Sequence, residues 1–437
     1  MSDQRPAGGA RRVLISSYIG SVVEWYDFML YGTAAALVFN RLFFTDLDPA
    51  AGTIASFGTM AVGYLARPLG GIVFGHFGDR LGRKKMLVTS ILMMGFATVL
   101  IGALPTYEQI GIWAPILLVL LRLVQGVAVG GEWGGAVLMT LEHAKKNRRG
   151  LWSSVAQMGT PSGLLLSTLV FSLFAALPEE QFLSWGWRVP FLVTVVMIGL
   201  GLWMRLGVEE SPVFQRAQAA AAAKPGAAEP KLPLVGLLRR NPRQVVLASL
   251  IGFGPFFANS ILIHFIVSYS VDIGYDKSVT LHGLMVGSLA SMVCLPLFAA
   301  LSDRIGRRPV YLAGALLLAA NSFLLFTMVN AQSSGLLILG FAISMGVHAM
   351  MYGPMGAFMA ELFGPRTRYT GASIGYQVAS IAGGFGPMIG GALLEAAGGP
   401  PHTLYLSLFM SAMLALTVLA VVIVKETNKT DLASERP

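Results

Sequence analysis

The chain has 437 residues, of which 55% are hydrophobic and only 12% are charged, whereas about a quarter of the residues are charged in ordinary soluble domains. This composition excludes a typical soluble globular protein, and the single cysteine, Cys294, excludes a disulfide framework or a cysteine-built metal site. The net charge of +9 would suit a nucleic-acid partner, so the positions of the basic residues decide what it means.

Apolar residues fall into twelve runs of about 20 residues or more, the length that crosses a bilayer core of about 30 Å. In chain order the runs are 13–44, 52–78, 86–104, 112–143, 151–177, 187–206, 244–272, 280–302, 310–329, 336–362, 370–397 and 402–424. The first run is longer than a signal-peptide core and contains Glu24 and Asp27, so we interpret it as a membrane helix. The sequence therefore predicts an all-α membrane protein with twelve transmembrane helices.

Basic residues concentrate on one side of this predicted topology. The N-terminus, every second loop and the C-terminus together hold 26 of the 31 Lys and Arg residues. Positive residues stay on the cytoplasmic side of a membrane, which predicts that both termini are cytoplasmic. The excess of Lys and Arg therefore indicates how the chain is oriented in the membrane. We expect it to lie in a lipid bilayer and not to bind a nucleic acid.

A polar segment recurs between two apolar runs in each half of the chain. Residues 75–85 read GHFGDRLGRKK, and residues 299–309 read AALSDRIGRRP. Duplicated halves with matched hinges are typical of alternating-access carriers. We predict two pseudo-symmetric six-helix bundles at 1–206 and 244–437, joined by a cytoplasmic linker at 207–243 whose middle is low in complexity.

The hinges carry residues that suit a gate. Asp79 and Asp303 are expected just past a helix end, where a carboxylate can accept hydrogen bonds from the first N–H groups of a neighbouring helix. Gly82 and Gly306 permit the tight reversal into the next span.

In each hinge, a basic residue is expected to lie opposite a glutamate at the end of another apolar run. Arg83 and Arg307 can reach Glu142 and Glu361, and Arg80 adds to the first cluster. Such charge clusters would hold the cytoplasmic side closed. The alternative is simple anchoring by positive residues, which accounts for the Lys and Arg residues but not for the matched Asp and Gly.

The motif Gly-x-x-x-Asp-Arg-x-Gly-Arg-Lys at 75–84, weakly repeated at 299–308, resembles the signature of the major facilitator superfamily. Further segments resemble its metabolite:proton symporter branch, namely EWYDF at 24–28, RPLGG at 67–71, RLVQGVAVGGEW at 122–133, WGWRVP at 185–190 and ESP at 210–212. Within that branch, VFNR at 38–41 and QFLS at 181–184 most resemble bacterial shikimate transporters. The resemblance implies the major facilitator fold and proton-driven transport of a small metabolite.

Two departures from related patterns narrow the class. Superfamily antiporters often carry Gly-Pro-x-x-Gly-Gly in helix 5, whereas run 5 reads GTPSG at 159–163 and the pattern stands at 386–391, which favours symport. The osmosensing proline/betaine members carry a C-terminal coiled coil. No heptad pattern follows run 12 here, so we do not expect an osmosensor.

Ionisable residues deep in a membrane are functional candidates by default. With a helical rise of about 1.5 Å per residue, five of them fall in one central layer: Glu24, Asp27, Arg67, Arg122 and Glu132. Three carboxylates face two permanently charged guanidinium groups. One carboxylate is in excess and is expected to take up and release a proton.

We assign the proton to Asp27, because a Tyr-Asp pair in helix 1 resembles the proton site of related sugar:proton symporters. Arg122 is its expected partner when Asp27 is ionised. Glu132 with Arg67 is expected to be a more static pair, and Glu24 is the second candidate carrier. The alternative is that all five residues form a fixed ion network.

Neutral polar residues are expected to complete the substrate site. Arg67 and Arg122 would bind a carboxylate, and amides or tyrosines would bind hydroxyl groups. The candidates are Tyr26, Tyr31, Gln125, Trp133 and Gln157 from the first half and Asn259, His264, Tyr352, Tyr376 and Gln377 from the second. A lone intramembrane His or Asn more often joins helices than binds substrate.

These expectations converge on a multi-pass protein of the bacterial inner membrane. We predict a proton-coupled importer of a small organic acid, with a shikimate-like hydroxylated carboxylate favoured and di- or tricarboxylates or aromatic acids next. It needs no cofactor besides the coupling proton and is expected to work as a monomer. The alternatives are uptake of a zwitterion such as proline or betaine, an antiporter that exports hydrophobic compounds, and a nutrient sensor. No nucleophile or metal-ligand cluster predicts an enzyme.

Overall fold

A computed structural model of the chain describes residues 7–81, 83–130, 133–142, 144, 146–206, 237, 239, 241–365 and 367–430. At 7–13, 16, 75–81, 83, 84, 87, 135, 136, 139, 142, 146 and 204–206 it describes the backbone alone. Every regular element among the described residues is helical. The predicted all-α class is therefore confirmed.

The chain up to residue 206 forms twelve helical elements and two 3₁₀ turns in its described part. They are α1 (Ala7–Leu37), α2 (Phe39–Leu42), α3 (Pro49–Leu81), α4 (Arg83–Ala103), α5 (Tyr107–Ile110), α6 (Trp113–Val129), α7 (Trp133–Glu142), η1 (Lys146–Arg148), α8 (Arg149–Gln157), α9 (Gly159–Ala175), α10 (Glu179–Ser184), η2 (Gly186–Arg188), α11 (Val189–Leu192) and α12 (Thr194–Leu206).

The remaining chain forms longer, less interrupted helices. They are α15 (Pro242–Ser260), the π-helical turn η3 (Ile261–Phe265), α16 (Ile266–Asp272), α17 (Lys277–Ile305), α18 (Arg307–Asn330), α19 (Ser334–Glu361), α20 (Arg368–Ala396) and α21 (Leu404–Ile423). The predicted linker at 207–243 falls mainly outside the described residues.

Nine helical segments within the described residues are long and apolar enough to cross a membrane. They are Pro49–Phe74, Arg149–Ala175, Gly186–Trp203, Pro242–Asp272, Lys277–Ile305, Arg307–Asn330, Ser334–Glu361, Arg368–Ala396 and Leu404–Ile423. Two shorter helices, Val88–Ala103 and Trp113–Val129, are also apolar. The chain is thus a multi-pass membrane protein, while the count of twelve spans stays a prediction.

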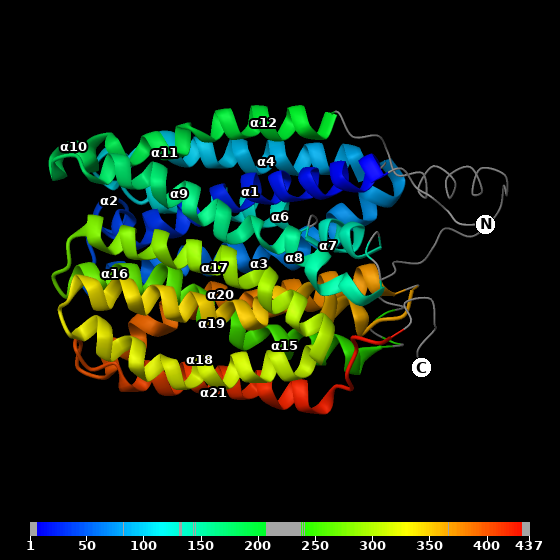
Figure 1. Cartoon of the computed structure of the whole chain (residues 1–437). Coiled ribbons are helices and arrows are strands. Elements are labelled where there is room, and N and C mark those ends of the chain that lie inside the picture. Colours follow the sequence, from blue (N-terminus) through cyan, green and yellow to red (C-terminus); the bar gives the residue numbers. More distant parts are fainter. Residues whose placement is uncertain are drawn as a thin grey trace, which may run out of the picture.

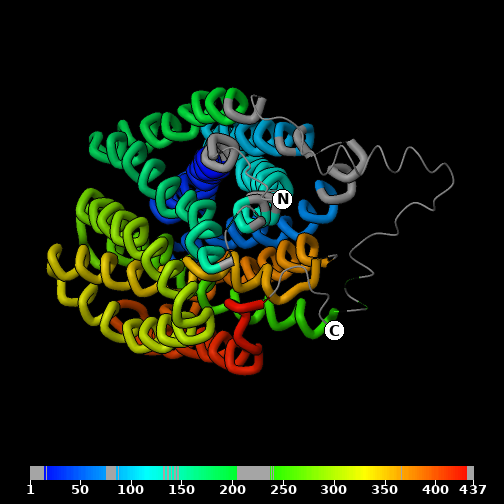
Figure 2. Tube along the Cα trace, turned by 45° about the vertical axis from the view of Figure 1, so that its right-hand side comes forward, coloured from blue at the N-terminus to red at the C-terminus, as the bar shows by residue number. Residues whose placement is uncertain are grey.

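The long helices run side by side, with α1–α12 on one side of the molecule and α15–α21 on the other (Figure 1). The two halves pack together through α3 against α20 and α9 against α17, and α8 packs against both α17 and α19. Figure 2 shows the same division from a second direction. The interface between the halves therefore runs through the middle of the molecule.

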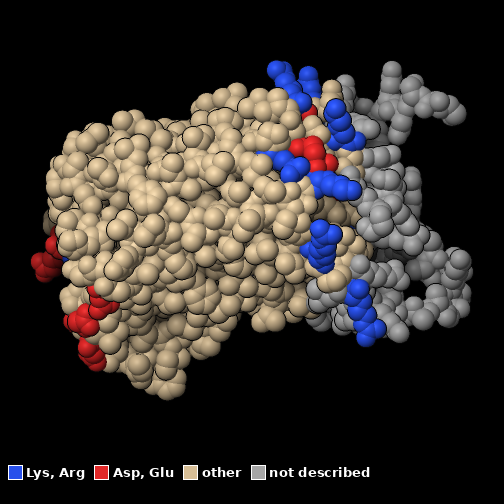
Figure 3. Space-filling view, turned by 90° about the horizontal axis from the view of Figure 1, so that it is seen from below, with Lys and Arg blue, Asp and Glu red and all other residues tan. Residues whose placement is uncertain are grey.

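The two ends of the helices differ in charge. We call them the Glu179 end, where α10 begins, and the Asp303 end, where α17 finishes. On the face in Figure 3, Lys and Arg gather at the Asp303 end, and Asp and Glu predominate at the Glu179 end. The wide band between them carries neither kind of residue, as expected for a surface that faces lipid.

The second hinge has the tight reversal that its glycine predicted. Gly306 separates α17 from α18 with a φ of +112°, a conformation that side-chain-bearing residues avoid. The reversal places Arg307, the first residue of α18, beside Asp303 of the preceding helix.

Candidate substrate and proton site

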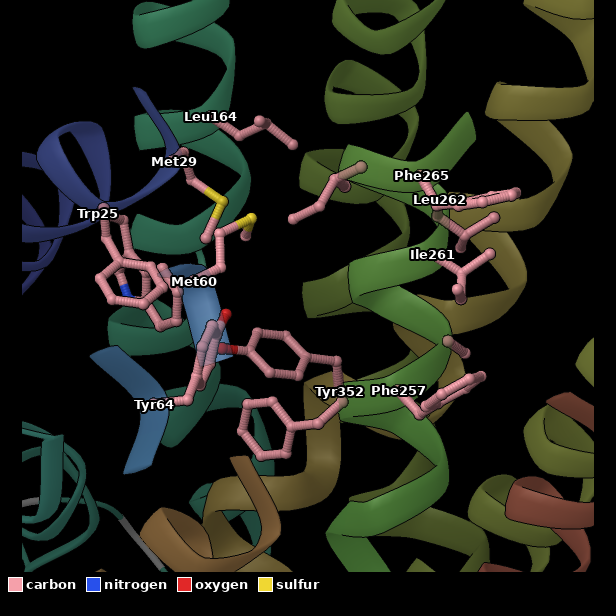
Figure 4. Close-up of a cluster of buried hydrophobic side chains, with 14 of the residues drawn as sticks. Trp25, Met29, Met60, Tyr64, Leu164, Phe257, Ile261, Leu262, Phe265 and Tyr352 are labelled. Carbon is pink, nitrogen blue, oxygen red and sulfur yellow. The ribbon is translucent and has the colours of Figure 1, made fainter. Parts of the chain in front are cut away.

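Buried charged residues lie where α1, α3 and α6 of the first half approach η3, α19 and α20 of the second. Asp27, Arg67 and Arg122 are all at most 1% exposed. Around them lies an apolar cluster shared by both halves, in which Tyr64 and Tyr352 point toward one another (Figure 4). Arg67 and Arg122 therefore lie within electrostatic reach of Tyr352 and His264 of the second half, whereas Asp27 is enclosed by the first half.

Asp27 of α1 is held by hydroxyl groups. Thr194 of α12 donates a hydrogen bond of 2.7 Å to its Oδ1, and the hydroxyl of Thr98 lies beside the same carboxylate. Within the described part of the chain no Lys or Arg forms an ion pair with Asp27. Asp27 and Arg122 are thus not in direct contact in this structure, and the pair predicted for the ionised carboxylate stays a prediction.

Arg122 is connected to Asp27 indirectly. Its Nη1 donates to Oε1 of Gln125 at 3.0 Å, and Nε2 of Gln125 donates to the hydroxyl of Thr98 at 2.7 Å. The candidate Gln125 therefore bridges the cation and the proton site. Thr98, which the sequence analysis did not single out, is the missing member of this relay.

Aromatic rings take the place of carboxylates around both arginines. The Arg67 Cζ lies 4.0 Å from the Phe28 ring centroid, 4.3 Å from that of Tyr64 and 5.5 Å from that of Trp25. The Arg122 Cζ lies 4.0 Å from the Phe28 centroid and 4.1 Å from that of Tyr31. A cation over an aromatic face is stabilised by the ring quadrupole, most strongly when water is excluded.

Most nitrogen atoms of the two arginines make no hydrogen bond within the described part of the chain. They are Nε, Nη1 and Nη2 of Arg67 and Nε and Nη2 of Arg122. The predicted partner of Arg67, Glu132, lies outside the described residues. Gly63 leaves room for Arg122, since a Cβ at that position would stand 2.5 Å from its Nε. The arrangement leaves donors available to an anion.

Glu24, the second candidate carrier, is buried on α1. It lies one turn before Asp27 on α1 and within electrostatic reach of Tyr376 on α20. It therefore borders the interface between the halves rather than the Asp27–Thr98 relay.

Several predicted substrate residues contact one another across the interface. The rings of Trp133 and Tyr376 stack with centroids 3.6 Å apart and an interplanar angle of 14°. Nε1 of Trp133 donates to Oε1 of Gln157 at 2.9 Å, and Nε2 of Gln377 donates to the carbonyl of Gly130 at 2.9 Å.

Tyr352 of α19 completes this set. Its hydroxyl is 2.9 Å from that of Thr160 and 3.1 Å from that of Tyr376, and its carbonyl accepts from Gln157 at 3.4 Å. We call Trp133, Gln157, Thr160, Tyr352, Tyr376 and Gln377 the cross-half network. Sequence reasoning named all of these except Thr160, but it did not predict that they contact each other.

Other candidates are less closely connected to the interface network. The hydroxyl of Tyr26 donates to the carbonyl of Pro190, within the first half, and that of Tyr31 donates to Thr59 at 2.5 Å. Asn259 is only partly buried on α15. These contacts favour a structural role for Tyr26. The hydroxyl of Tyr31 is bound to Thr59, and the face of its ring lies against Arg122.

His264 is the most unusual of the second-half candidates. It is fully buried in the π-helical turn η3, and neither ring nitrogen has a hydrogen-bond partner within the described part of the chain. It lies so close to α1 that a Cβ on Gly32 would be 1.9 Å from its Cε1. π-Helical turns are frequent at functional sites, so His264 stays a candidate for substrate contact.

A charge cluster joins the halves at the Asp303 end. The carboxylate of Asp303 accepts hydrogen bonds from the N–H groups of Gly150 and Leu151, at the start of α8, at 2.8 and 2.9 Å. Arg307 forms ion pairs with Asp303 at 2.8 Å and with Glu361 at 3.2 Å. The predicted contacts of the second hinge are therefore present, and we call them the Asp303 latch.

The structure adds two details to the predicted gate. Asp303 lies inside the last turn of α17 rather than beyond the helix end. At the matching positions of the first hinge, the structure describes the backbone alone; these residues are Asp79, Arg80, Arg83 and Glu142. A gating role for both hinges stays a prediction.

The segment after α21 also meets this latch. Glu426 accepts hydrogen bonds from the N–H groups of Arg307 and Arg308 at 2.8 and 3.0 Å, and the hydroxyl of Thr427 donates to Glu361 at 2.7 Å. Arg149 of α8 donates to the carbonyl of Thr430 at 2.7 Å. The C-terminal segment thus touches both halves at the Asp303 end.

We expect Glu426 to make the thermal stability of the protein depend on pH in the acid range. Burial alone would raise the pKa of this carboxyl, but backbone N–H donors outweigh it and hold the pKa below the ordinary 4.5. Its contribution is therefore present above pH 4.5 and lost as the pH falls through the lowered value. We expect Glu426→Gln to lower the melting temperature at pH 7 by about 1–3 °C, with a smaller difference below pH 4. The matched control is Glu395→Gln, at an exposed carboxylate; equal shifts in both variants would contradict the assignment.

A smaller cluster joins the halves at the Glu179 end, and sequence reasoning did not predict it. Glu179 of α10 pairs with Arg41 of the same half and, at 3.6 Å, with Lys277 at the start of α17. Lys277 also lies 5.3 Å from the ring centroid of Phe182. Both ends of the interface are therefore bridged in this conformation.

The comparisons with known proteins agree with this architecture. Residues 13–231 match the family described as "Sugar (and other) transporter", and residues 278–437 match the "Major Facilitator Superfamily". The solved structure of a proton:xylose symporter bound to 6-bromo-6-deoxy-D-glucose has a TM-score of 0.78 and 19% identity, and the match covers 98% of both chains. These similarities define a membrane transporter and not an enzyme.

Closer relatives are found among curated proteins. The shikimate transporter of Escherichia coli strain K12 is 46% identical, over 93% of this chain and 94% of that protein. The proline/betaine transporter of Salmonella typhimurium strain LT2 is 32% identical, over 89% of this chain and 78% of that protein. The chain belongs to the major facilitator superfamily, and its resemblance to shikimate transporters is confirmed.

Proposed function

We propose that the chain is a proton-coupled symporter that imports a small organic acid, with a shikimate-like hydroxylated carboxylate as the favoured substrate. One observation carries the proposal. Two fully buried arginines have no carboxylate partner, and a buried carboxylate beside them has no cation partner, within the described residues. Buried charges are normally paired, so this arrangement suits a site in which an anion and a proton come and go.

The topology follows from the distribution of basic residues. We infer twelve spans with both termini on the cytoplasmic side of a bacterial inner membrane, since Lys and Arg favour the cytoplasmic side and gather at the Asp303 end (Figure 3). On this orientation the Asp303 latch and the cross-half network close the cytoplasmic side, and Glu179 with Lys277 closes the outer side.

The proposed transport cycle uses these groups in order. From the outside, Asp27 takes up a proton, and the substrate carboxylate binds the free nitrogen atoms of Arg122 with Arg67 nearby. Loading neutralises charge at the centre, which favours closure around the site. The Asp303 latch and the cross-half network then separate, Asp27 releases its proton inward, and the substrate leaves.

The relay through Gln125 and Thr98 gives a route for the coupling. A hydroxyl donates to one acceptor at a time. Protonation of Asp27 would therefore change the acceptor of the Thr98 hydroxyl, and with it the hydrogen bond between Thr98 and Gln125. Substrate binding at Arg122 and proton binding at Asp27 would thereby influence one another without a direct ion pair.

A zwitterion such as proline or betaine is the second candidate, because the proline/betaine transporter is a relative of the chain. Ammonium groups of such ligands are recognised by aromatic faces. Here the faces of Phe28, Tyr31 and Tyr64 are already covered by the protein's own guanidinium groups. That arrangement favours an anion over a cationic group.

Proton movement on addition of substrate tests the proposal. Purified protein in liposomes with a trapped pH-sensitive dye should acidify the lumen when shikimate is added outside without an imposed gradient, and glycine betaine should not produce this change. Acidification with glycine betaine alone would favour the second candidate. Shikimate uptake with no proton movement would contradict proton coupling.

A further inference from the structure

Phe28 stands between the two buried arginines. Both guanidinium carbons lie 4.0 Å from the centroid of its ring, so the two carbons are at most 8.0 Å apart. A guanidinium group is flat and about as wide as the ring, so one ring face at this distance has room for one group only. Arg67 and Arg122 therefore cover opposite faces of Phe28.

Each of the two guanidinium groups has nitrogens without a hydrogen-bond partner among the described residues, and these nitrogens could bind the oxygen atoms of a ligand. Gln125 holds Nη1 of Arg122, which leaves Nε and Nη2 without a partner in the described structure. These two nitrogens form the side-on edge that binds a carboxylate through two parallel bonds. On the other ring face, none of the three nitrogens of Arg67 has a hydrogen-bond partner among the described residues.

The rings also account for the proximity of two like charges that have no carboxylate between them among the residues that the structure describes. Tyr31 covers Arg122, and Tyr64 and Trp25 flank Arg67, so each cation faces at least two π surfaces that attract it. A carboxylate spacer would instead compete with an incoming anion for the same donors. An apolar ring leaves the donors unoccupied.

We propose that Phe28 is a positioning residue that separates Arg67 and Arg122 into two binding points, so that the site selects a carboxylate carrying a second oxygen acceptor. The carboxylate binds the side-on edge of Arg122, and a hydroxyl or second carboxylate oxygen binds Arg67. The proposal rests on the proposed function, in that the imported acid passes this site.

Binding selectivity tests this assignment. The two probes are shikimate, a ring carboxylate with hydroxyl groups, and cyclohex-1-enecarboxylate, which has the same ring and carboxylate without them. The wild-type protein should bind shikimate at least tenfold more tightly, the effect of one added hydrogen bond to a charged group. Phe28→Leu should reduce that ratio to near one by weakening shikimate binding, with cyclohex-1-enecarboxylate little changed.

Phe28→Tyr is the matched variant, because it keeps the ring faces and should keep the ratio. Equal weakening of both probes in Phe28→Leu, or an unchanged ratio, would overturn the positioning role while the proposed function stands. A wild-type protein that binds neither probe, yet melts cooperatively, would overturn a shikimate-like acid as the favoured substrate and this inference with it.

Discussion

Replacing Arg122 by lysine is expected to weaken substrate binding by about 10–100-fold. Lysine keeps the positive charge but lacks the planar pair of donors that a carboxylate binds bidentately. Hydrogen bonds to charged groups contribute about 1.5–3 kcal/mol each, and the variant loses one of them together with the anchor on Gln125. The dissociation constant of purified protein for shikimate, measured by calorimetry, checks this expectation.

A matched control separates the site from general effects of losing a guanidinium group. Arg188 lies outside the central layer and donates to the carbonyls of Gly102 and Leu104, so Arg188→Lys should bind shikimate as the wild type does. Wild-type affinity in Arg122→Lys would show that the carboxylate binds elsewhere. Equal losses in both variants would indicate a folding effect.

Replacing Asp27 by asparagine is expected to abolish accumulation driven by a pH gradient while substrate exchange continues. Asparagine has nearly the same shape and can still accept the hydrogen bond from Thr194, but it cannot take up and release a proton. In liposomes loaded with unlabelled substrate, counterflow of labelled shikimate should persist. Net uptake with an acidic exterior should fall to the level of empty liposomes.

Glu24→Gln is the comparison that distinguishes the two candidate carriers. If Asp27 carries the proton, Glu24→Gln should keep acid-driven accumulation, even if its rate changes. Acid-driven accumulation that survives in Asp27→Asn and disappears in Glu24→Gln would transfer the role to Glu24.

The sequence predicted most about the hinges and least about the partners of buried charges. Asp303, Arg307 and Glu361 were predictable because they sit at helix ends in a repeated motif, where few partners are within reach. Counting charges identified Asp27 and Arg122 and predicted that they pair when Asp27 is ionised, whereas in this structure Gln125 and Thr98 connect them. The count considered carboxylates alone, although Phe28 and Tyr31 satisfy the cation and Thr194 satisfies the carboxylate.

Other features depend on how the helices are rotated about their axes, which no single run of residues reveals. Trp133 and Tyr376 could be placed in the central region from the sequence, but their stacking joins α7 to α20, 243 positions apart. Likewise, Thr160 and Lys277 gain their roles only through residues of the opposite half. Contacts between halves are where sequence reasoning reached its limit.

The latch at Asp303 has a consequence for attempts to trap one state of the carrier. Its donors on α8 belong to the main chain, so ordinary side-chain substitutions of Leu151 leave the N–H group in place. Only proline would delete it. A Cβ at Gly150 would stand 2.7 Å from the main-chain oxygen of Ala299 on α17, so a larger residue there would force α8 and α17 to shift. If the latch gates transport as proposed, a variant that favours the state open at the Asp303 end is best designed on α17, where the carboxylate of Asp303 accepts both hydrogen bonds.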